Sequence, residues 1–161
     1  MNLSGKEIGD ESLVKDLEAL IRSHDVDPSH MIFEITETAA ITDLEKAIQF
    51  VDELRGLGFR FALDDFGVGF TSFLYLREIN IDYLKIDGAF VRRLNESTAD
   101  QGIVRAITSV AKGFGIRTIA EFVEKKETMD LLKSLGADYA QGFLIGRPGP
   151  EPVATYSKDL P

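Results

Sequence analysis

Apolar residues along the chain follow two alternating patterns, one typical of helices and one typical of short buried strands. Leu13, Leu17 and Ile21 recur at the spacing of one helix face, whereas the apolar run at 31–35 is typical of a buried strand. The pattern predicts helices over Asp10–Arg22, Thr42–Leu57, Ala99–Phe114 and Lys125–Leu135, and a short one over Ser72–Arg77. It predicts strands over Met31–Ile35, Arg60–Leu63, Asp82–Ile86, Ile116–Ala120 and Asp138–Ala140, with the end of an earlier strand at Met1–Leu3. Helices and strands therefore alternate along the chain.

The start of the second helix carries a capping signal. Thr42 stands three residues before Glu45, which is the spacing of a capping box, so Thr42 is predicted to be the N-cap. Gly56 and Gly58 follow the last apolar positions and are predicted to end this helix.

Repeated strand-then-helix units with short connections predict parallel strands covered by helices. An open flavodoxin-like sheet and a (β/α) barrel both fit this periodicity. No Gly-x-Gly-x-x-Gly follows the first full strand, which argues against a dinucleotide-binding fold. Polar residues follow nearly every strand, not only the strands beside one crevice, and this favours the barrel. We therefore expect an α/β fold of the TIM-barrel type, and the length of 161 residues predicts a single domain over residues 1–161.

The polar residues at the predicted strand ends would converge on one mouth of such a barrel. In chain order they are Asn2, Glu34, Thr36, Glu37, Asp64, Asp65, Lys85, Asp87, Glu121, Glu124 and Gln141. Carboxylates with one lysine are typical of a site for a hard cation such as Mg²⁺ or Mn²⁺. Two adjacent aspartates can bridge two such ions, and the bridged pair can activate a water for attack on a phosphodiester. A lysine there would orient the water or hold developing negative charge, and a glutamate would accept the proton.

Each of these residues also has a structural interpretation. The Asp64–Asp65 pair would cap the next helix, and Glu37 would favour the first turn of the helix that follows it. Lys85 would form an ion pair with Asp64 or Asp87 inside the core. Asn2 would be a terminal residue without a functional role. Glu121 and Glu124 would be acids at the start of a helix.

Charge and composition limit the kinds of partner that the chain is expected to bind. The chain has 27 acidic and 18 basic residues and a net charge of −9, which argues against binding a nucleic-acid polymer. A small phosphate ligand stays compatible with this charge, because divalent cations reverse the sign of a local acidic site. There are no cysteines for disulfides or thiolate metal sites, and no apolar run approaches the ~20 residues of a membrane span. His24 and His30 flank a predicted loop and are expected at the surface, not as ligands. We expect no membrane contact from this segment and a cytoplasmic location.

Six motifs in this order resemble the EAL domain, a TIM-barrel family of bacterial phosphodiesterases that open cyclic di-GMP to the linear pGpG. The resemblance rests on residues 2–4 (Asn-Leu-Ser), 33–37 (Phe-Glu-Ile-Thr-Glu), 64–72 (Asp-Asp-Phe-Gly-Val-Gly-Phe-Thr-Ser), 84–87 (Leu-Lys-Ile-Asp), 120–124 (Ala-Glu-Phe-Val-Glu) and 141–143 (Gln-Gly-Phe), with Pro148 after them. Together these motifs span essentially the whole chain.

The resemblance implies a role for each strand-end residue. It implies metal ligands at Asn2, Glu34, Asp64 and Asp65. It implies a catalytic pair, with Lys85 holding the attacking water and Glu121 acting as general base. It implies that the mouth and the substrate contacts are completed by Asp87, Glu124 and Gln141. Glu37 would anchor the flexible loop Asp65–Ser72, which in this family links metal binding, substrate binding and dimer contacts.

The chain departs from the family pattern in three places. Phe122 replaces a glycine more often seen there, and mild loop variants stand at Val68, Phe70, Thr71 and Phe73. The Glu-Ala-Leu motif that names the family, with its metal-ligating glutamate, is absent; residues 18–20 spell it but lie after Asn2 in a predicted helix. A complete barrel typically has about 250 residues, roughly 90 more than this chain. We therefore expect an N-terminally truncated barrel with five full strands and the end of a sixth.

The truncation carries further expectations. Two open sheet edges invite pairing, so we expect a homodimer or higher oligomer. With one ligand missing, the chain alone is expected to hydrolyse cyclic di-GMP weakly or not at all. The resemblance also implies a parent protein that carries GGDEF or sensory domains and is in some cases membrane-anchored. Two alternatives stay open: a non-catalytic cyclic di-GMP receptor or interaction module on an EAL scaffold, and an unrelated barrel enzyme that uses Lys85 for metal-dependent or Schiff-base chemistry.

Overall fold

The sheet at the centre of the molecule consists of six parallel strands. In the computed structural model, which describes residues 1–68 and 75–149, the strands are adjacent in chain order. They are β1 (Asn2–Leu3), β2 (Ile32–Thr36), β3 (Arg60–Phe66), β4 (Tyr83–Ile86), β5 (Arg117–Ala120) and β6 (Tyr139–Ala140). Each neighbouring pair is parallel, so the C-terminal ends of all six strands lie at the same edge of the sheet.

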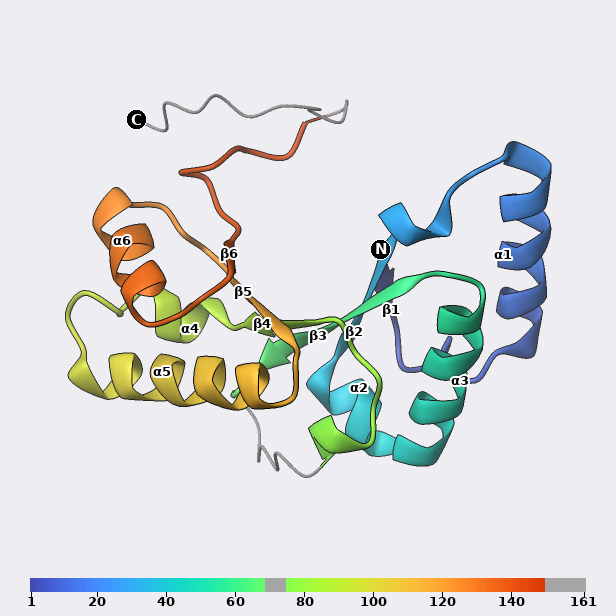
Figure 1. Ribbon diagram of the computed structural model, residues 1–161, viewed down its shortest axis with the longest axis horizontal. Helices are drawn as coiled ribbons and strands as arrows, with labels where there is room; N and C mark the ends of the chain where they lie inside the picture. Colours follow the sequence, from blue (N-terminus) through green and yellow to red (C-terminus); the bar gives the residue numbers. More distant parts are fainter. Residues whose placement is uncertain (69–74, 150–161) are drawn as a thin grey trace.

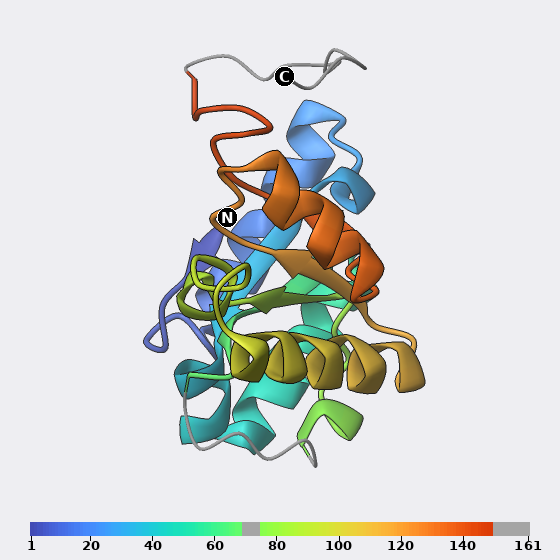
Figure 2. The ribbon, with the colours of Figure 1, turned by 90° about the vertical axis from the view of Figure 1, so that its left-hand side faces the viewer.

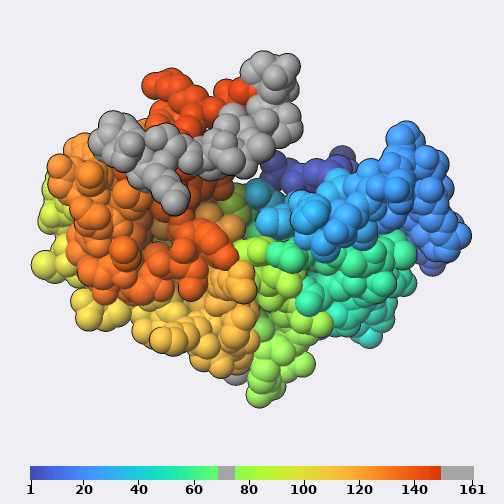
Figure 3. Space-filling model, turned by 45° about the horizontal axis from the view of Figure 1, so that its top comes forward, coloured from blue at the N-terminus to red at the C-terminus, as the bar shows by residue number. Residues whose placement is uncertain are grey.

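Helices connect the strands and pack on the outside of the twisted sheet (Figures 1 and 2). They are α1 (Glu11–His24), α2 (Glu37–Thr42), α3 (Leu44–Gly56), α4 (Gly88–Val91), α5 (Thr98–Gly113) and α6 (Lys126–Ser134), with 3₁₀ turns at Pro28–His30 and Tyr75–Arg77. The space-filling view in Figure 3 shows α1 and α6 at opposite ends of the molecule.

Strand alternation separates the core from the mouth. All four residues of β4 are buried. Two of them, Leu84 and Ile86, belong to the hydrophobic core that also includes Val104 and Ile107 of α5. Successive strand residues point to opposite faces, so Tyr83 and Lys85 lie on the other, inner face of the sheet. The core therefore fills the space between sheet and helices, and the inner face is left to carry polar chemistry.

The predicted elements are confirmed to within a few residues, with two omissions and one error. The short helices α2 and α4 were not predicted, and only the Tyr75–Arg77 part of the predicted Ser72–Arg77 helix falls within the described residues. The N-cap prediction for Thr42 is wrong. Thr42 ends α2 and donates to the carbonyl of Thr38, whereas the side chain of Asp43 accepts from the Lys46 amide and caps α3.

The sheet is open where a barrel would close. Among the described residues, β1 pairs only with β2 and β6 only with β5. This arrangement corresponds to six successive strands of a barrel, with one edge at β1 and the other at β6, and it bears out the TIM-barrel type of fold.

Candidate functional site

Lys85 is the centre of the strand-end cluster. Its side chain is only 4% exposed, and its Nζ lies 2.8 Å from Glu34 Oε2, 2.9 Å from Asp64 Oδ1 and 2.8 Å from Glu121 Oε1. These three acids come from β2, from β3 and from the residue after β5. The structure thus brings together predicted residues that are up to 87 positions apart in the chain, counted from Glu34 to Glu121.

Asp65 joins the cluster because β3 is irregular. Between Leu63 and Phe66, β3 has one more residue than the facing segment of β4, which is a bulge, and Asp65 has a positive φ of 56°. In a regular strand, two consecutive side chains point to opposite faces. The bulge redirects the second one, as bulges beside active sites do. As a result, Asp64, Asp65 and Glu121 each offer an oxygen within 4.8 Å of the others.

The charges in this cluster are unbalanced, and the pKa values reflect that. Burial by itself would lower the pKa of Lys85, but its contacts with Glu121, Glu34 and Asp64 raise it above the ordinary value. Burial raises the pKa of Glu121; the hydrogen bond and charge of Lys85 oppose this rise, and the charges of Asp64 and Asp65 add to it. Burial of the carboxyl group, followed by the charges of Asp64 and Asp87, raises the pKa of Asp65.

The donor set fits a hard divalent cation. Four carboxylates face one ammonium, and carboxylate oxygens are the ligands that Mg²⁺ and Mn²⁺ prefer. A cation between Asp64, Asp65 and Glu121 would relieve the repulsion that raises the pKa of two of these acids. The cluster includes Glu121, for which the sequence predicted the role of a base, whereas the predicted ligand Glu34 faces Lys85.

Two structural alternatives are settled by the positions of the acids. Lys85 does pair with Asp64, whereas Asp87 accepts from the Ala89 amide and caps α4. The helix-start alternative for Glu121 and Glu124 is wrong, because α6 begins only at Lys126.

Glu37 is buried behind the mouth and connects three segments. It lies in the first turn of α2, as the structural alternative had it, and is 4% exposed. Its Oε2 accepts from the Gly67 amide at 3.2 Å and its Oε1 accepts from the Tyr75 hydroxyl at 2.8 Å. Burial, together with this hydrogen bond, raises the pKa of Tyr75. Glu37 therefore contacts both ends of the connection after β3. Positions 69–72 of the predicted loop Asp65–Ser72 lie outside the described residues, and so do the variants Phe70, Thr71 and Phe73.

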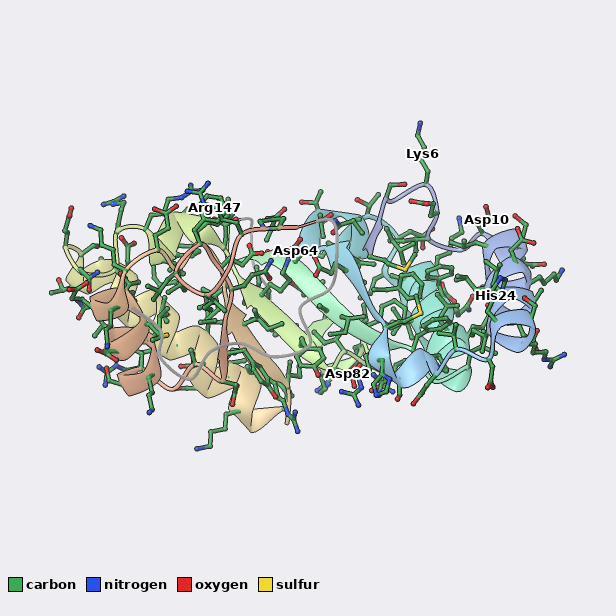
Figure 4. The ribbon with its side chains drawn as sticks, turned by 90° about the horizontal axis from the view of Figure 1, so that it is seen from above. Lys6, Asp10, His24, Asp64, Asp82 and Arg147 are labelled. Carbon is green, nitrogen blue, oxygen red and sulfur yellow. The ribbon has the colours of Figure 1, made fainter. Side chains whose placement is uncertain are left out.

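The remaining predicted residues line the rim. Asn2 is in register with Glu34 on the neighbouring strand, so it stands beside the cluster. Glu124 and Gln141 line a cavity of about 550 Å³, to which Glu121 also contributes. Figure 4 shows Asp64 at one edge of the sheet, with Arg147 on the same side and His24 far away on α1, as expected for a surface histidine.

Sequence reasoning missed several residues around this cavity. Arg92, Phe143 and Arg147 line it, and the guanidinium groups stack on aromatic rings, Arg92 on Phe122 at 3.8 Å and Arg147 on Phe143 at 4.4 Å. Tyr75, the partner of Glu37, was also missed. The one available signal was Phe122 itself, which stands at a position where the family pattern favours glycine. The backbone explains that preference, because φ at residue 122 is 54°.

No helix within residues 1–68 and 75–149 is both long and apolar enough to cross a membrane.

Comparisons with known protein families and with individual proteins all point to the same family. The EAL domain family matches residues 1–148. Cyclic di-GMP phosphodiesterase PdeB of Shewanella oneidensis is 46% identical over 160 residues, which cover 99% of this chain and 18% of that protein. The bifunctional diguanylate cyclase/cyclic di-GMP phosphodiesterase MucR of Pseudomonas aeruginosa is 35% identical over 150 residues, covering 93% of this chain and 22% of MucR.

Solved structures agree with this result. The MucR phosphodiesterase in complex with c-di-GMP superimposes with a TM-score of 0.87 at 35% identity, covering 92% of this chain and 60% of that one. BlrP1 of Klebsiella pneumoniae, in a complex with calcium and c-di-GMP, gives a TM-score of 0.84 at 31% identity, covering 91% of this chain and 38% of that one. The chain thus spans less than two thirds of these relatives.

Proposed function

Because this chain belongs to the EAL domain family, we propose that it forms the metal-binding and catalytic half of a cyclic di-GMP phosphodiesterase site. The observation that carries the proposal is the cluster of Asp64, Asp65 and Glu121 around Lys85 at the C-terminal ends of parallel strands. In barrel enzymes, this is the end that carries catalysis. Relatives named as cyclic di-GMP phosphodiesterases, and the c-di-GMP complexes of MucR and BlrP1, supply the substrate class.

We assign the metal ligands to Asp64 and Asp65, with Glu34 and Asn2 completing the set. Glu121, which has an oxygen within 4.8 Å of the aspartate oxygens, is assigned to the base. When bound, two Mg²⁺ or Mn²⁺ ions would supply Lewis-acid stabilisation of the phosphoryl oxygens and lower the pKa of a water. The calcium in the BlrP1 complex is consistent with a site that takes hard cations.

The chain's own residues carry the proton and the charge. Hydrolysis adds water across one phosphodiester P–O bond, which leaves a 5′-phosphate and a 3′-hydroxyl in pGpG. Lys85 is kept protonated by its three carboxylate neighbours, so its positive charge would stabilise the negative charge that develops on the attacking water and the phosphoryl group. Burial makes Glu121 a stronger base than an exposed glutamate, which suits it to accept the proton from the water.

The protonation of Lys85 argues against the Schiff-base alternative. A lysine nucleophile must lose its proton, and a nearby cationic group or desolvation normally helps it to do so. Here three carboxylates within 2.9 Å of the Nζ stabilise the charged form.

The cleanest test measures binding and hydrolysis separately on the chain of residues 1–161. Titration calorimetry should show binding of Mn²⁺ and, with Ca²⁺ present, of cyclic di-GMP. Chromatography with Mg²⁺ should show weak formation of pGpG or none, because one expected metal ligand is missing from residues 1–161. Asp65→Asn should remove metal binding, whereas Asp130→Asn, the same change on the exposed surface of α6, should not.

The outcomes separate the alternatives. Metal-dependent formation of pGpG by the wild-type chain that is lost in Asp65→Asn supports the enzyme. Binding of cyclic di-GMP without hydrolysis, in a protein in which the strands beyond β1 and β6 are also present, would favour the receptor alternative. Metal binding unaffected by Asp65→Asn would contradict the assigned ligands.

A further inference from the structure

Phe122 has a backbone conformation that is unusual for a bulky residue. Its φ is 54°, in the left-handed region that side chains other than glycine rarely adopt, and 47% of the residue is exposed. A strained and exposed phenylalanine gains little from core packing. Strain of this kind is concentrated at functional sites, so the position calls for a functional explanation.

The ring is held from one side by α4. A Cβ atom at Gly88 would come within 2.1 Å of the Phe122 ring, so the glycine is needed for the ring to lie where it does. The guanidinium of Arg92 lies 3.8 Å from the ring centroid. Gly88 and Arg92 are four residues apart and therefore on the same side of this helical turn. The ring thus rests across the end of α4, with its orientation fixed by a close backbone contact and a cation–π contact.

Phe122 and Arg92 both line the cavity of about 550 Å³, and the Phe122 residue stays 47% exposed. Glu121, the adjacent residue, points into the carboxylate cluster, so the ring lies directly beside the proposed reaction site. Arg147 and Phe143 form a second cation–aromatic pair on the same cavity. Ligand pockets commonly have volumes of about 300–1,000 Å³, and planar stacking surfaces near arginines are typical of nucleobase sites.

We propose that the exposed face of the Phe122 ring is a stacking surface for a purine base of the dinucleotide substrate, held in place by Gly88 and Arg92. The inference rests on the proposed function and adds a substrate-positioning residue to it. The carboxylates and Lys85 would act on the phosphodiester, and Phe122 would position the attached nucleoside. A base stacks on an aromatic face without regard to sequence, because every base has a π-face.

The test uses GMP and ribose 5-phosphate as probes, in EDTA, so that no metal-dependent step contributes. Ligand-observed NMR on the chain of residues 1–161 should show saturation transfer to the H8 proton of GMP. Phe122→Gly should weaken GMP binding by about 5- to 100-fold, the range given by base stacking on an aromatic side chain, and should leave the weaker binding of ribose 5-phosphate unchanged.

Stability measurements keep this test free of folding artefacts. Glycine is unstrained at φ 54°, so Phe122→Gly should melt at the same temperature as the wild type or higher. Phe122→Leu keeps an apolar side chain of similar bulk but has no π-face, and it should lose GMP affinity in the same way. Phe114→Ala, which removes an exposed phenylalanine after α5, serves as the matched control and should bind GMP as the wild type does.

Two results would overturn the inference: GMP binding no tighter than ribose 5-phosphate binding in the wild type, or equal GMP affinities in the wild type and both Phe122 variants. The proposed function is read separately, from metal-dependent formation of pGpG. A base site without hydrolysis, in a protein that also has the strands beyond β1 and β6, would leave the stacking role standing and favour the receptor alternative. Hydrolysis without a base site would refute the stacking role and support the enzyme.

Discussion

Acidic side chains at the two ends of the strands have different surroundings. Before β4, Asp82 accepts from Arg55 and from the Phe61 amide, and before β6, Asp138 accepts from both the amide and the hydroxyl of Thr118. At the opposite ends of the strands, four carboxylates face Lys85. Figure 4 shows Asp82 and Asp64 on opposite sides of the molecule.

The comparison separates structural acids from candidate functional ones. An acid with its own donors is accounted for by stability, because its hydrogen bonds offset the cost of partial burial. Several acids that share one cation are not explained by stability in this way, because in the metal-free chain they have too few donors to offset their burial and mutual repulsion. In barrels, the N-terminal ends of the strands contribute mainly stability and the C-terminal ends contribute catalysis, and the charge balance here follows the same division. Experiments at both ends can test whether the division holds.

Removing Lys85 should have the largest effect on stability. In Lys85→Met, the partly buried carboxylates of Glu34, Asp64 and Glu121 lose their shared cation, and breaking a buried ion pair of this kind costs about 3–5 kcal/mol. Urea denaturation in EDTA measures the free energy of unfolding. The control is Lys46→Met, since its pair with Asp43 is exposed and worth at most about 1 kcal/mol. Equal losses in the two variants would show that the mouth is no more dependent on its cation than the surface is.

A divalent cation should stabilise the mouth but not the opposite end. Mn²⁺ at 100 times its dissociation constant should raise the free energy of unfolding by about 2.7 kcal/mol. Asp65→Asn should abolish most of this increase and, without metal, should slightly stabilise the chain, because burial and then the charges of Asp64 and Asp87 disfavour the charge that it removes. Thermal denaturation with and without Mn²⁺ measures both effects, the stabilisation by the cation and the stabilisation by Asp65→Asn without it. A metal-dependent increase that survives in Asp65→Asn would place the cation elsewhere.

Asp82→Asn should behave in the opposite way to Asp65→Asn. The substitution removes the charge that Arg55 and the Phe61 amide contact, so it should destabilise the chain by about 1.5–3 kcal/mol, the range for hydrogen bonds to charged groups. The increase in the free energy of unfolding that Mn²⁺ produces should be the same in Asp82→Asn as in the wild type. The same pair of denaturation curves measures this variant, and a neutral or stabilising effect would remove the distinction between the two ends.

The sequence predicted the sheet and most of the mouth because both depend on local patterns. Short apolar runs followed by polar residues define where strands end, and parallel strands bring these ends together. Lys85 was recognisable because a lysine between Leu84 and Ile86 needs partners inside a core. The pattern also indicated that these partners would be carboxylates at neighbouring strand ends.

The parts that the sequence did not reveal depend on backbone geometry. The bulge that turns Asp65 toward the cluster has no signal in the Asp-Asp pair itself, and the helix after Glu37 is too short to show a periodicity. Asp43, next to Thr42, is an equally good N-cap residue, so the capping box alone could not decide between them. The stacking of Arg92 on Phe122 joins two segments 30 positions apart and has no local signature.

Two tyrosines provide the finest comparison between the ends. Tyr75 donates to the buried Glu37 near the mouth, whereas at the other end Tyr83 accepts from the exposed Arg60. Tyr75→Phe leaves a buried carboxylate oxygen without this donor and should cost about 1–3 kcal/mol. Tyr83→Phe returns Arg60 to water and should cost less than about 1 kcal/mol. Denaturation of both variants under identical conditions measures the difference. A larger loss for Tyr83→Phe would mean that the end without the acidic cluster is the more tightly held, and that Glu37 does not anchor the connection after β3.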